Sequence, residues 1–182
     1  MNIPIVPQDP LLLLDVDGVL NPLGKRTRGH RRYDLTLDEE TYTVFLDRRH
    51  GAKLLALAAE TGAELVWATT WEHWANEWIG PRIGLPRLPV IELGDDSPVT
   101  HGEMFKTPYV ADYVRHRPFV WFDDALWAAD QRYLEAHPNV GDFLLVEVDQ
   151  RLGLTDGHLD LAREWLTGLR RDTPDDDAML ER

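Results

Sequence analysis

Four short apolar segments in this chain each run directly into polar residues, and patterns typical of helices separate them. Short apolar runs that are bounded by polar residues are typical of buried strands. Strands that alternate with helices predict a parallel sheet with helices on both faces. The sequence therefore predicts an α/β fold, a Rossmann-like three-layer sandwich, with strands expected at residues 11–14, 64–68, 118–122 and 143–148.

Helices are expected between and after these strands, at residues 52–61, 71–79, 108–114, 126–136 and 159–169. Gly62 is expected to close the first helix as a C-cap, and Asp156 to cap the N-terminus of the last. Alternating apolar and polar residues over 33–47 predict a small β-hairpin inserted after the first strand. The Pro- and Gly-rich residues 80–103 predict an irregular loop, so neither insert amounts to a full cap domain.

One folded domain is the simplest organisation for 182 residues, and we expect it to span residues 1–171. Residues 172–182 are acidic with little apolar material and predict a disordered tail. The chain has no cysteine, which excludes disulfides and thiol catalysis. It shows neither a secretory signal nor an apolar run long enough to span a membrane. We therefore expect a cytoplasmic protein without membrane contact, and the sequence leaves its oligomeric state open.

The charge of the chain is uneven. A formal net charge of -13 argues against general adhesion to nucleic acid or to an anionic membrane. Residues 25–32, however, hold five lysines and arginines together with His30 and no acidic residue. This basic run has two interpretations: it is an ordinary solvated loop, or it attracts an anionic phosphate substrate near the mouth of a site.

Carboxylates follow two of the expected strands. Asp15 and Asp17 come directly after the first strand, and Asp123 and Asp124 follow the third. Because a buried carboxylate is unfavourable unless something pairs with it, carboxylates this close imply a bound cation or a shared proton. In open parallel sheets, ligands bind beyond the carboxyl ends of the strands. The pattern predicts a cation-dependent site at that edge of the sheet.

The Asp-x-Asp-Gly-Val motif after an apolar strand resembles the first motif of the haloacid dehalogenase-like (HAD) phosphatases. Three later stretches are similar to the other motifs of that family: Thr69 in ELVWATTW, Lys106 in MFKTPYV, and Asp123 with Asp124 in FVWFDDA. The resemblance covers most of the chain. It implies a minimally capped HAD domain that hydrolyses phosphate monoesters with Mg²⁺ through an aspartyl-phosphate intermediate. The stretches WATTWEHWAN and DVDGVLNP are also similar to the HAD module associated with bacterial RNA-repair proteins.

The resemblance implies a role for each matched residue. Asp15 is the expected nucleophile, and Asp17 the expected general acid and base. The expected metal ligands are Asp15, Asp17 through its backbone carbonyl, Asp123 and Asp124. The residues expected to bind substrate are Thr69, Thr70, Lys106 and Gly18, with Thr70 as the alternative to Thr69 in the second motif. Among the three lysines of the chain, Lys106 alone lies between the second and fourth motifs.

Several alternatives remain open at this point. Family members that break carbon–halogen bonds generally lack an acid at the position of Asp17, so phosphoryl transfer is favoured. The substrate is a small metabolite, a nucleotide or a nucleic-acid phosphate end. A catalytically silent HAD-like binding protein is one alternative to the enzyme, and a receiver-like phospho-acceptor domain is another. The order of the motifs disagrees with a receiver domain. In a receiver the acidic pair belongs on the first strand, whereas in this chain the pair Asp123 and Asp124 comes late. A P-loop kinase is excluded because the chain has no Gly-x-x-x-x-Gly-Lys.

The aromatic and histidine residues near the second motif have structural interpretations as well. Trp71, Trp74 and Trp78 follow helical spacing, so we expect them to share one helix face that packs on the sheet. The alternative is an aromatic platform for a nucleobase beside Thr69. His73 and His101 have no partner at metal-ligand spacing and are expected to be surface or loop residues.

Overall fold

The computed structural model describes residues 9–37, 39–94 and 102–172. Its centre is a parallel sheet in the order β4-β1-β5-β6, built from β1 (Leu11–Leu14), β4 (Glu64–Trp67), β5 (Phe119–Asp123) and β6 (Phe143–Glu147). β1 is an inner strand, because Leu14 pairs with Trp67 on one side and with Phe122 on the other. The expected α/β fold is confirmed, together with all four expected strands.

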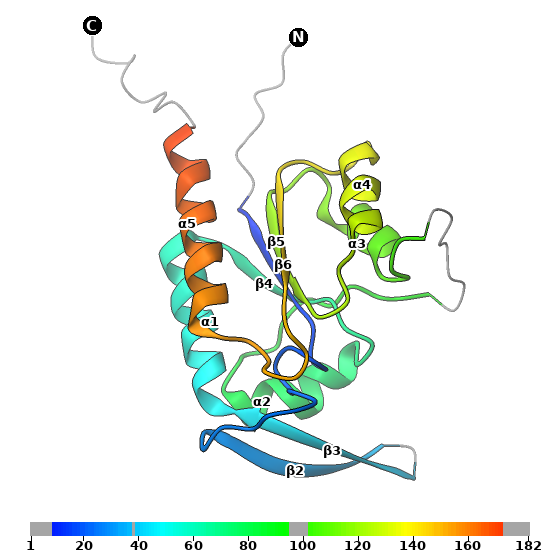
Figure 1. The fold of residues 1–182 in the computed structure, drawn as a ribbon, viewed down its shortest axis with the longest axis vertical. Helices are drawn as coiled ribbons and strands as arrows, with labels where there is room; N and C mark the ends of the chain where they lie inside the picture. Colours follow the sequence, from blue (N-terminus) through cyan, green and yellow to red (C-terminus); the bar gives the residue numbers. More distant parts are fainter. Residues whose placement is uncertain (1–8, 38, 95–101, 173–182) are drawn as a thin grey trace, which may run out of the picture.

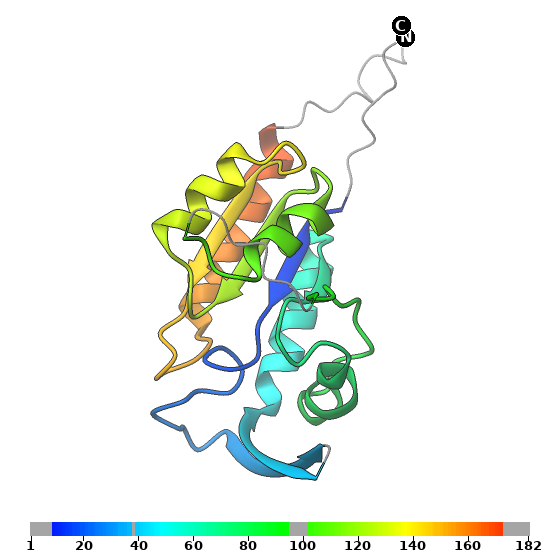
Figure 2. The ribbon, with the colours of Figure 1, turned by 90° about the vertical axis from the view of Figure 1, so that its right-hand side faces the viewer.

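Helices cover both faces of this sheet, as Figures 1 and 2 show. One face carries α1 (Arg48–Thr61) and α5 (Asp156–Asp172), and the other carries α3 (Thr107–Val114) and α4 (Ala128–Ala136). Successive leucines of β1 alternate between the two layers: Leu12 and Leu14 pack in the core of α1 and α5, and Leu11 and Leu13 in the core of α3 and α4. A strand buried on both faces needs an apolar residue at every position, which explains the run of four leucines.

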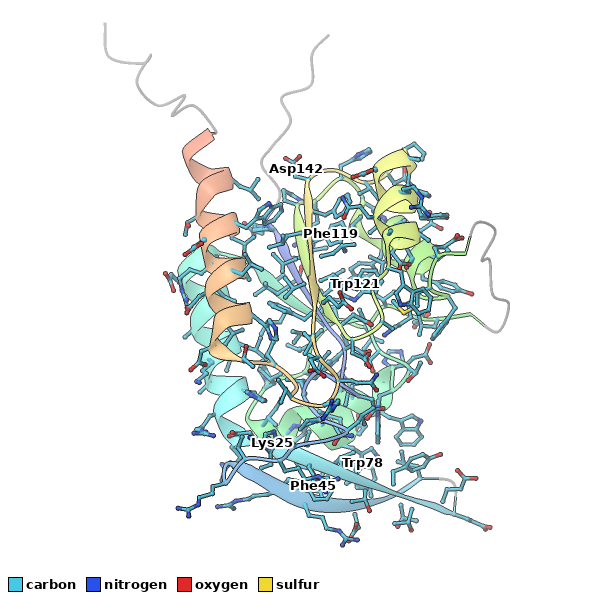
Figure 3. All side chains as sticks on the ribbon, viewed as in Figure 1. Lys25, Phe45, Trp78, Phe119, Trp121 and Asp142 are labelled. Carbon is cyan, nitrogen blue, oxygen red and sulfur yellow. The ribbon has the colours of Figure 1, made fainter. Side chains whose placement is uncertain are left out.

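The two tryptophans within strands belong to the core, as expected. Trp67 and Trp121 are both fully buried. Trp121 and Phe119 of β5 lie between the sheet and the layer of α3 and α4 (Figure 3). Trp67 faces the opposite layer, and its Nε1 donates a hydrogen bond to Asn76 Oδ1 at 3.0 Å.

Two helix ends show how local sequence sets the boundaries. α1 begins earlier than expected because the carboxylate of Asp47 accepts a hydrogen bond from the backbone N–H of Arg49 at 2.9 Å, which makes Asp47 the N-cap. Gly62 ends α1 in the left-handed region at φ 63°, and its prediction as the C-cap is confirmed. Asp156 is not a residue ahead of α5 but lies in its first turn, where it pairs with Lys53.

The expected hairpin is present and lies beyond the carboxyl ends of the sheet strands (Figure 1). It consists of β2 (His30–Leu37) and β3 (Glu40–Asp47), paired antiparallel. Leu35, Val44 and Leu46 are buried in the core that α1 and α5 share, so the hairpin is anchored to the domain along one face. Asp38, in the expected turn, is outside the described residues. No cap domain is present in the described part of the chain.

The prediction of a helix over residues 71–79 is confirmed in part: residues 73–83 are helical without a break, but residues 75–79 form a π-helix. The chain makes a turn at residues 71–72 and is then helical over residues 73–83, where the π-helix η1 (Ala75–Ile79) leads directly into α2 (Gly80–Ile83). α2 also shortens the loop expected at 80–103. Asn76 explains the irregularity: its amide accepts from the Leu88 N–H at 2.9 Å and donates to the Leu88 carbonyl at 2.8 Å. This buried side chain ties η1 to the loop that follows α2, while the helix itself continues to residue 83.

The surroundings of the nearby tryptophans differ accordingly. Trp71 is buried, whereas Trp74 is 45% exposed and does not pack on the sheet. Of the two histidines, His73 is exposed and lies 3.2 Å from Glu92, and His101 is outside the described residues.

Among the helices of residues 9–37, 39–94 and 102–172, none is long and apolar enough to cross a bilayer. The acidic residues 173–182 lie outside the described residues, while Asp172 is the last residue of α5. The cytoplasmic location and the domain boundary at residue 171 stay predictions.

Candidate active site

Asp15 is the first residue after β1, at the carboxyl edge of the sheet. Its backbone N–H donates to the Phe122 carbonyl at 3.1 Å, which holds Asp15 in line with the neighbouring strand. The side chain is nearly buried, and its Oδ1 accepts a hydrogen bond from the Val16 N–H at 2.7 Å. One carboxylate oxygen is thus held by the backbone, and the charge of Asp15 lies where the strands of the sheet end.

Lys106 joins Asp15 to the end of the neighbouring strand. Its Nζ donates to Asp15 Oδ2 at 2.7 Å and to Asp123 Oδ2 at 2.5 Å. The lysine lies directly ahead of α3 and is 4% exposed, and its side chain ends at the carboxyl edge of the sheet. Burial by itself lowers the pKa of Lys106, but the charges of Asp15 and Asp123 outweigh it and hold the pKa above its usual value. Lys106 is therefore a permanent cation between two carboxylates.

Asp123 and Asp124 bring the number of carboxylates at this point to three. Oxygens of Asp15, Asp123 and Asp124 all lie within 4.8 Å of one another. Burial, together with the charge of Asp15, raises the pKa of Asp123 to about 7, although Lys106 acts in the opposite direction. Burial and the charge of Asp15 also raise the pKa of Asp124. Both shifts disfavour the charged forms of these two carboxyl groups, with burial as the larger cause and the charge of Asp15 as the next.

This donor set fits a metal ion. Three carboxylates and one ammonium leave a local excess of negative charge that a divalent cation would neutralise. Clustered carboxylate oxygens are ligands for hard cations, and the described residues place no histidine among them. The cluster of Asp15, Asp123 and Asp124 can therefore bind a metal ion.

Asp17 does not belong to that carboxylate cluster, because its side chain is held elsewhere. Asn21 Nδ2 donates to Asp17 Oδ1 at 2.7 Å, and Trp71 Nε1 donates to Asp17 Oδ2 at 2.8 Å. Asn21 also accepts a hydrogen bond from the Phe45 N–H of β3 at 2.9 Å. Asp17 is thus oriented by the hairpin on one side and by an indole on the other.

Neither Asn21 nor Trp71 was assigned this role from the sequence. The only sequence signal for Asn21 is a polar side chain four positions after Asp17, in an otherwise apolar stretch. Trp71 gave no signal of this kind, since helical spacing with Trp74 and Trp78 predicted a packing role. Its partner lies 54 positions away in the chain.

The two threonines of the second motif lie in different surroundings. Thr69 is fully buried just after β4, next to Ala68, whose carbonyl lies 3.4 Å from Lys106 Nζ. Its hydroxyl accepts a hydrogen bond from the Trp71 N–H at 3.4 Å. Thr70 is exposed. The residue before Thr69 therefore contacts Lys106, while Thr69 is buried and Thr70 is exposed to solvent.

Gly18 is needed for the loop after β1. Its φ of +76° lies in the left-handed region, where residues with a Cβ are strained. An added Cβ would also overlap the Asp124 carboxyl group, at distances under 3.0 Å. Gly18 thus makes room for one of the three clustered carboxylates.

Gly18→Ala is expected to lower the free energy of unfolding by about 1–2 kcal/mol, because of the backbone strain, and to weaken metal binding by displacing Asp124. Urea unfolding and calorimetric titration with a divalent cation measure the two effects. The matched control is Gly168→Ala in α5, where no atom lies within 4 Å of the added Cβ, and where alanine favours the helix by up to about 1 kcal/mol. Unchanged metal affinity in Gly18→Ala would contradict the role given to Asp124.

A family model described as the HAD domain in Swiss Army Knife RNA repair proteins matches residues 11–159. The matched segment begins at β1 and contains all the residues of the candidate site that are described above. No curated protein and no solved structure matches the chain.

Proposed function

We propose that this chain, which belongs to the family of HAD domains in Swiss Army Knife RNA repair proteins, is a Mg²⁺-dependent phosphatase that acts on nucleic-acid phosphate ends. The resemblance to HAD phosphatases and to the RNA-repair module is confirmed by the family match. Membership of this family speaks against the receiver-domain alternative. The activity, the metal and the substrate are our proposal.

One observation carries the proposal: Asp15, Lys106, Asp123 and Asp124 meet at the carboxyl edge of the sheet although they come from three separate parts of the chain. A buried core does not need such a group, since three carboxylates and a lysine are less favourable there than apolar residues. Perturbed ionisable groups that cluster at the ligand-binding edge of an α/β sheet are typical of a catalytic site.

We assign the chemistry as follows. Asp15 attacks the phosphorus atom and forms an aspartyl-phosphate, while the alkoxide leaves with a proton from Asp17. Asp17 then takes a proton from the water that hydrolyses this intermediate. Lys106 and Thr69 hold the non-bridging oxygens of the phosphoryl group. Mg²⁺, held by Asp15, Asp123, Asp124 and the backbone carbonyl of Asp17, would neutralise the charge of the phosphoryl group.

A nucleic-acid end is the substrate class that we favour. The matching family is described by its occurrence in RNA repair proteins, and the described residues form no cap domain that would restrict the site to small molecules. Lys25, Arg28 and Arg31 are exposed at the start of the hairpin and form no ion pair with any residue that the structure describes. A locally basic surface on an acidic protein would favour the approach of a polyanion at this point.

The assay for this proposal measures phosphate release from single-stranded oligonucleotides that carry a 5′- or a 3′-phosphate, with Mg²⁺ and with a chelator. We expect release that depends on Mg²⁺ and exceeds the rate with glycerol phosphate. Binding of these oligonucleotides without any release of phosphate would instead support the catalytically silent alternative.

Trp71→Phe tests the orientation of Asp17. The phenyl ring keeps most of the packing, but the hydrogen bond from Nε1 to Asp17 is lost, so we expect kcat to fall roughly 10- to 100-fold with little change in KM. Steady-state kinetics measure both constants. Trp78→Phe is the matched control, because the buried Nε1 of Trp78 has no hydrogen-bond partner among the described residues. Equal kcat values for the two variants would remove Trp71 from the mechanism.

A further inference from the structure

A cavity of about 520 Å³ lies beside Asp17. One wall comes from the segments after β1 and β4 and consists of Asp17, Thr70, Trp71 and Trp74. The other wall comes from the hairpin and consists of Leu37, Glu40 and Tyr42. We call this space the hairpin cavity. Because Asp17 is both a wall of the hairpin cavity and the proposed acid and base, a ligand in the cavity is adjacent to the reacting phosphoryl group.

The register of the hairpin explains why its tip forms one wall. Residues that pair across β2 and β3 share a face, so Tyr42 opposite Leu35 and Glu40 opposite Leu37 lie on the same face as Val44. Leu35 and Val44 on this face are buried in the core, whereas Tyr42 and Glu40, nearer the tip, are exposed. The hairpin therefore extends past the core, and the end of its inner face lies over the loop after β4.

The walls of the hairpin cavity present flat aromatic surfaces. The rings of Tyr42 and Trp71 are 5.8 Å apart between centroids and meet edge to face at 66°. Trp71 is held in place by its hydrogen bond to Asp17. Trp74, by contrast, leaves nearly half of its surface exposed, at a position where packing on the sheet was expected. An exposed indole next to an oriented one offers a stacking surface to a planar ligand.

The charges that line the hairpin cavity restrict the chemical class of planar ligand that it can bind. Asp17 and Glu40 contribute two carboxylates, and no lysine or arginine lines the space among the described residues. Two carboxylates repel a second phosphate but accept hydrogen bonds from N–H groups. A volume of about 520 Å³ is within the usual range for small-molecule sites. An uncharged planar group with N–H donors, such as a nucleobase, meets all three conditions.

We propose that the hairpin cavity binds the base of the terminal nucleotide whose phosphate is presented to Asp15, with Trp74 as the stacking surface. This inference rests on the proposed phosphatase function and narrows its substrate to phosphate groups on a nucleotide that retains its base. A phosphotyrosine side chain is also planar, but its phenyl ring has no N–H donor for Asp17 or Glu40. The cavity therefore discriminates between a terminal nucleotide and the same terminus without a base.

Equilibrium binding tests the inference separately from turnover. We use the full chain with Asp15→Asn, so that the phosphate stays in place, and RNA oligonucleotides whose phosphorylated terminal nucleotide either carries a base or is abasic. We expect the base to tighten binding roughly 5- to 150-fold. In Trp74→Leu this preference is lost, and in Trp74→Phe, which keeps an aromatic face, much of it is retained.

The outcomes separate the two proposals. Equal affinity for the base-bearing and the abasic ends would overturn the base-binding inference, even if the wild-type protein releases phosphate from both. A preference that persists in Trp74→Leu, or tighter binding of a phosphotyrosine peptide than of the base-bearing end, would also overturn it. A base-dependent preference lost in Trp74→Leu, in a protein whose wild type releases no phosphate, would support the inference while contradicting the proposed phosphatase activity.

Discussion

Asp15→Asn is expected to lower kcat for phosphate release by at least about 10³-fold, because an amide cannot form the aspartyl-phosphate. The substitution is nearly isosteric, and an amide oxygen can still accept the hydrogen bond from the Val16 N–H. Lys106 keeps its contact with Asp123. The loss of activity should therefore occur in a folded protein. Thermal unfolding measures whether the fold is retained, and steady-state kinetics measure the fall in kcat.

Asp142→Asn is a suitable control for the loss of one carboxylate. Asp142 is exposed and precedes β6, at the end of the sheet opposite the hairpin (Figure 3). Its replacement removes the same charge from the protein without touching the cluster, so kcat should remain that of the wild type. Activity in Asp15→Asn above one tenth of the wild-type value would rule out Asp15 as the nucleophile.

Lys106→Met is expected to have the largest effect on stability. Methionine fills a similar space but leaves Asp15 and Asp123 without the cation that pairs with both, in surroundings where Asp123 is fully buried. Removal of one partner from a buried ion pair lowers the free energy of unfolding by about 3–5 kcal/mol. Urea unfolding in the presence of a chelator measures this loss.

Mg²⁺ should restore part of the stability that Lys106→Met loses, because a cation bound to the folded state compensates the same carboxylates. The matched control is Lys53→Met: Lys53 pairs with Asp156 on the surface, where an ion pair contributes about 1 kcal/mol or less. A Lys106→Met protein as stable as the wild type without Mg²⁺ would show that the lysine does not hold the cluster together. Phosphate release by this variant should be lost even with Mg²⁺, since no ammonium remains for the phosphoryl oxygens.

The strands and the order of the site residues could be predicted because they depend on short stretches of sequence. Four consecutive leucines do not alternate with polar residues, which is typical of a strand covered on both faces, and β1 has this environment. Parallel strands align their carboxyl ends, so acidic residues at the carboxyl ends of β1 and β5 were expected to come near one another. Thr69, with Thr70 as its alternative, and Lys106 were assigned from the resemblance to the family motifs, and their roles stay predictions.

The segment after β4 shows where this reasoning fails. The spacing of Trp71, Trp74 and Trp78 is that of a helix face, but the helix begins only after Trp71 and is a π-helix over residues 75–79, where Asn76 bonds to Leu88 and Trp67. The indole of Trp71 is part of the buried core, as expected, but its Nε1 also donates a hydrogen bond to Asp17. Leu88 and Asp17 are far in sequence from the residues that they bind. The periodic spacing of apolar residues is a local property, so it cannot predict these contacts.

The buried strands and the carboxylates at their ends could be predicted from the amino-acid sequence, because apolar runs and their polar boundaries act over a few residues. Two contacts could not be predicted in this way: Lys106 reaches Asp15 across 91 positions, and the inner face of the hairpin extends as far as the cavity that Trp74 lines. These contacts depend on how whole elements pack against one another, and the packing is settled by the shape and burial of the complete core.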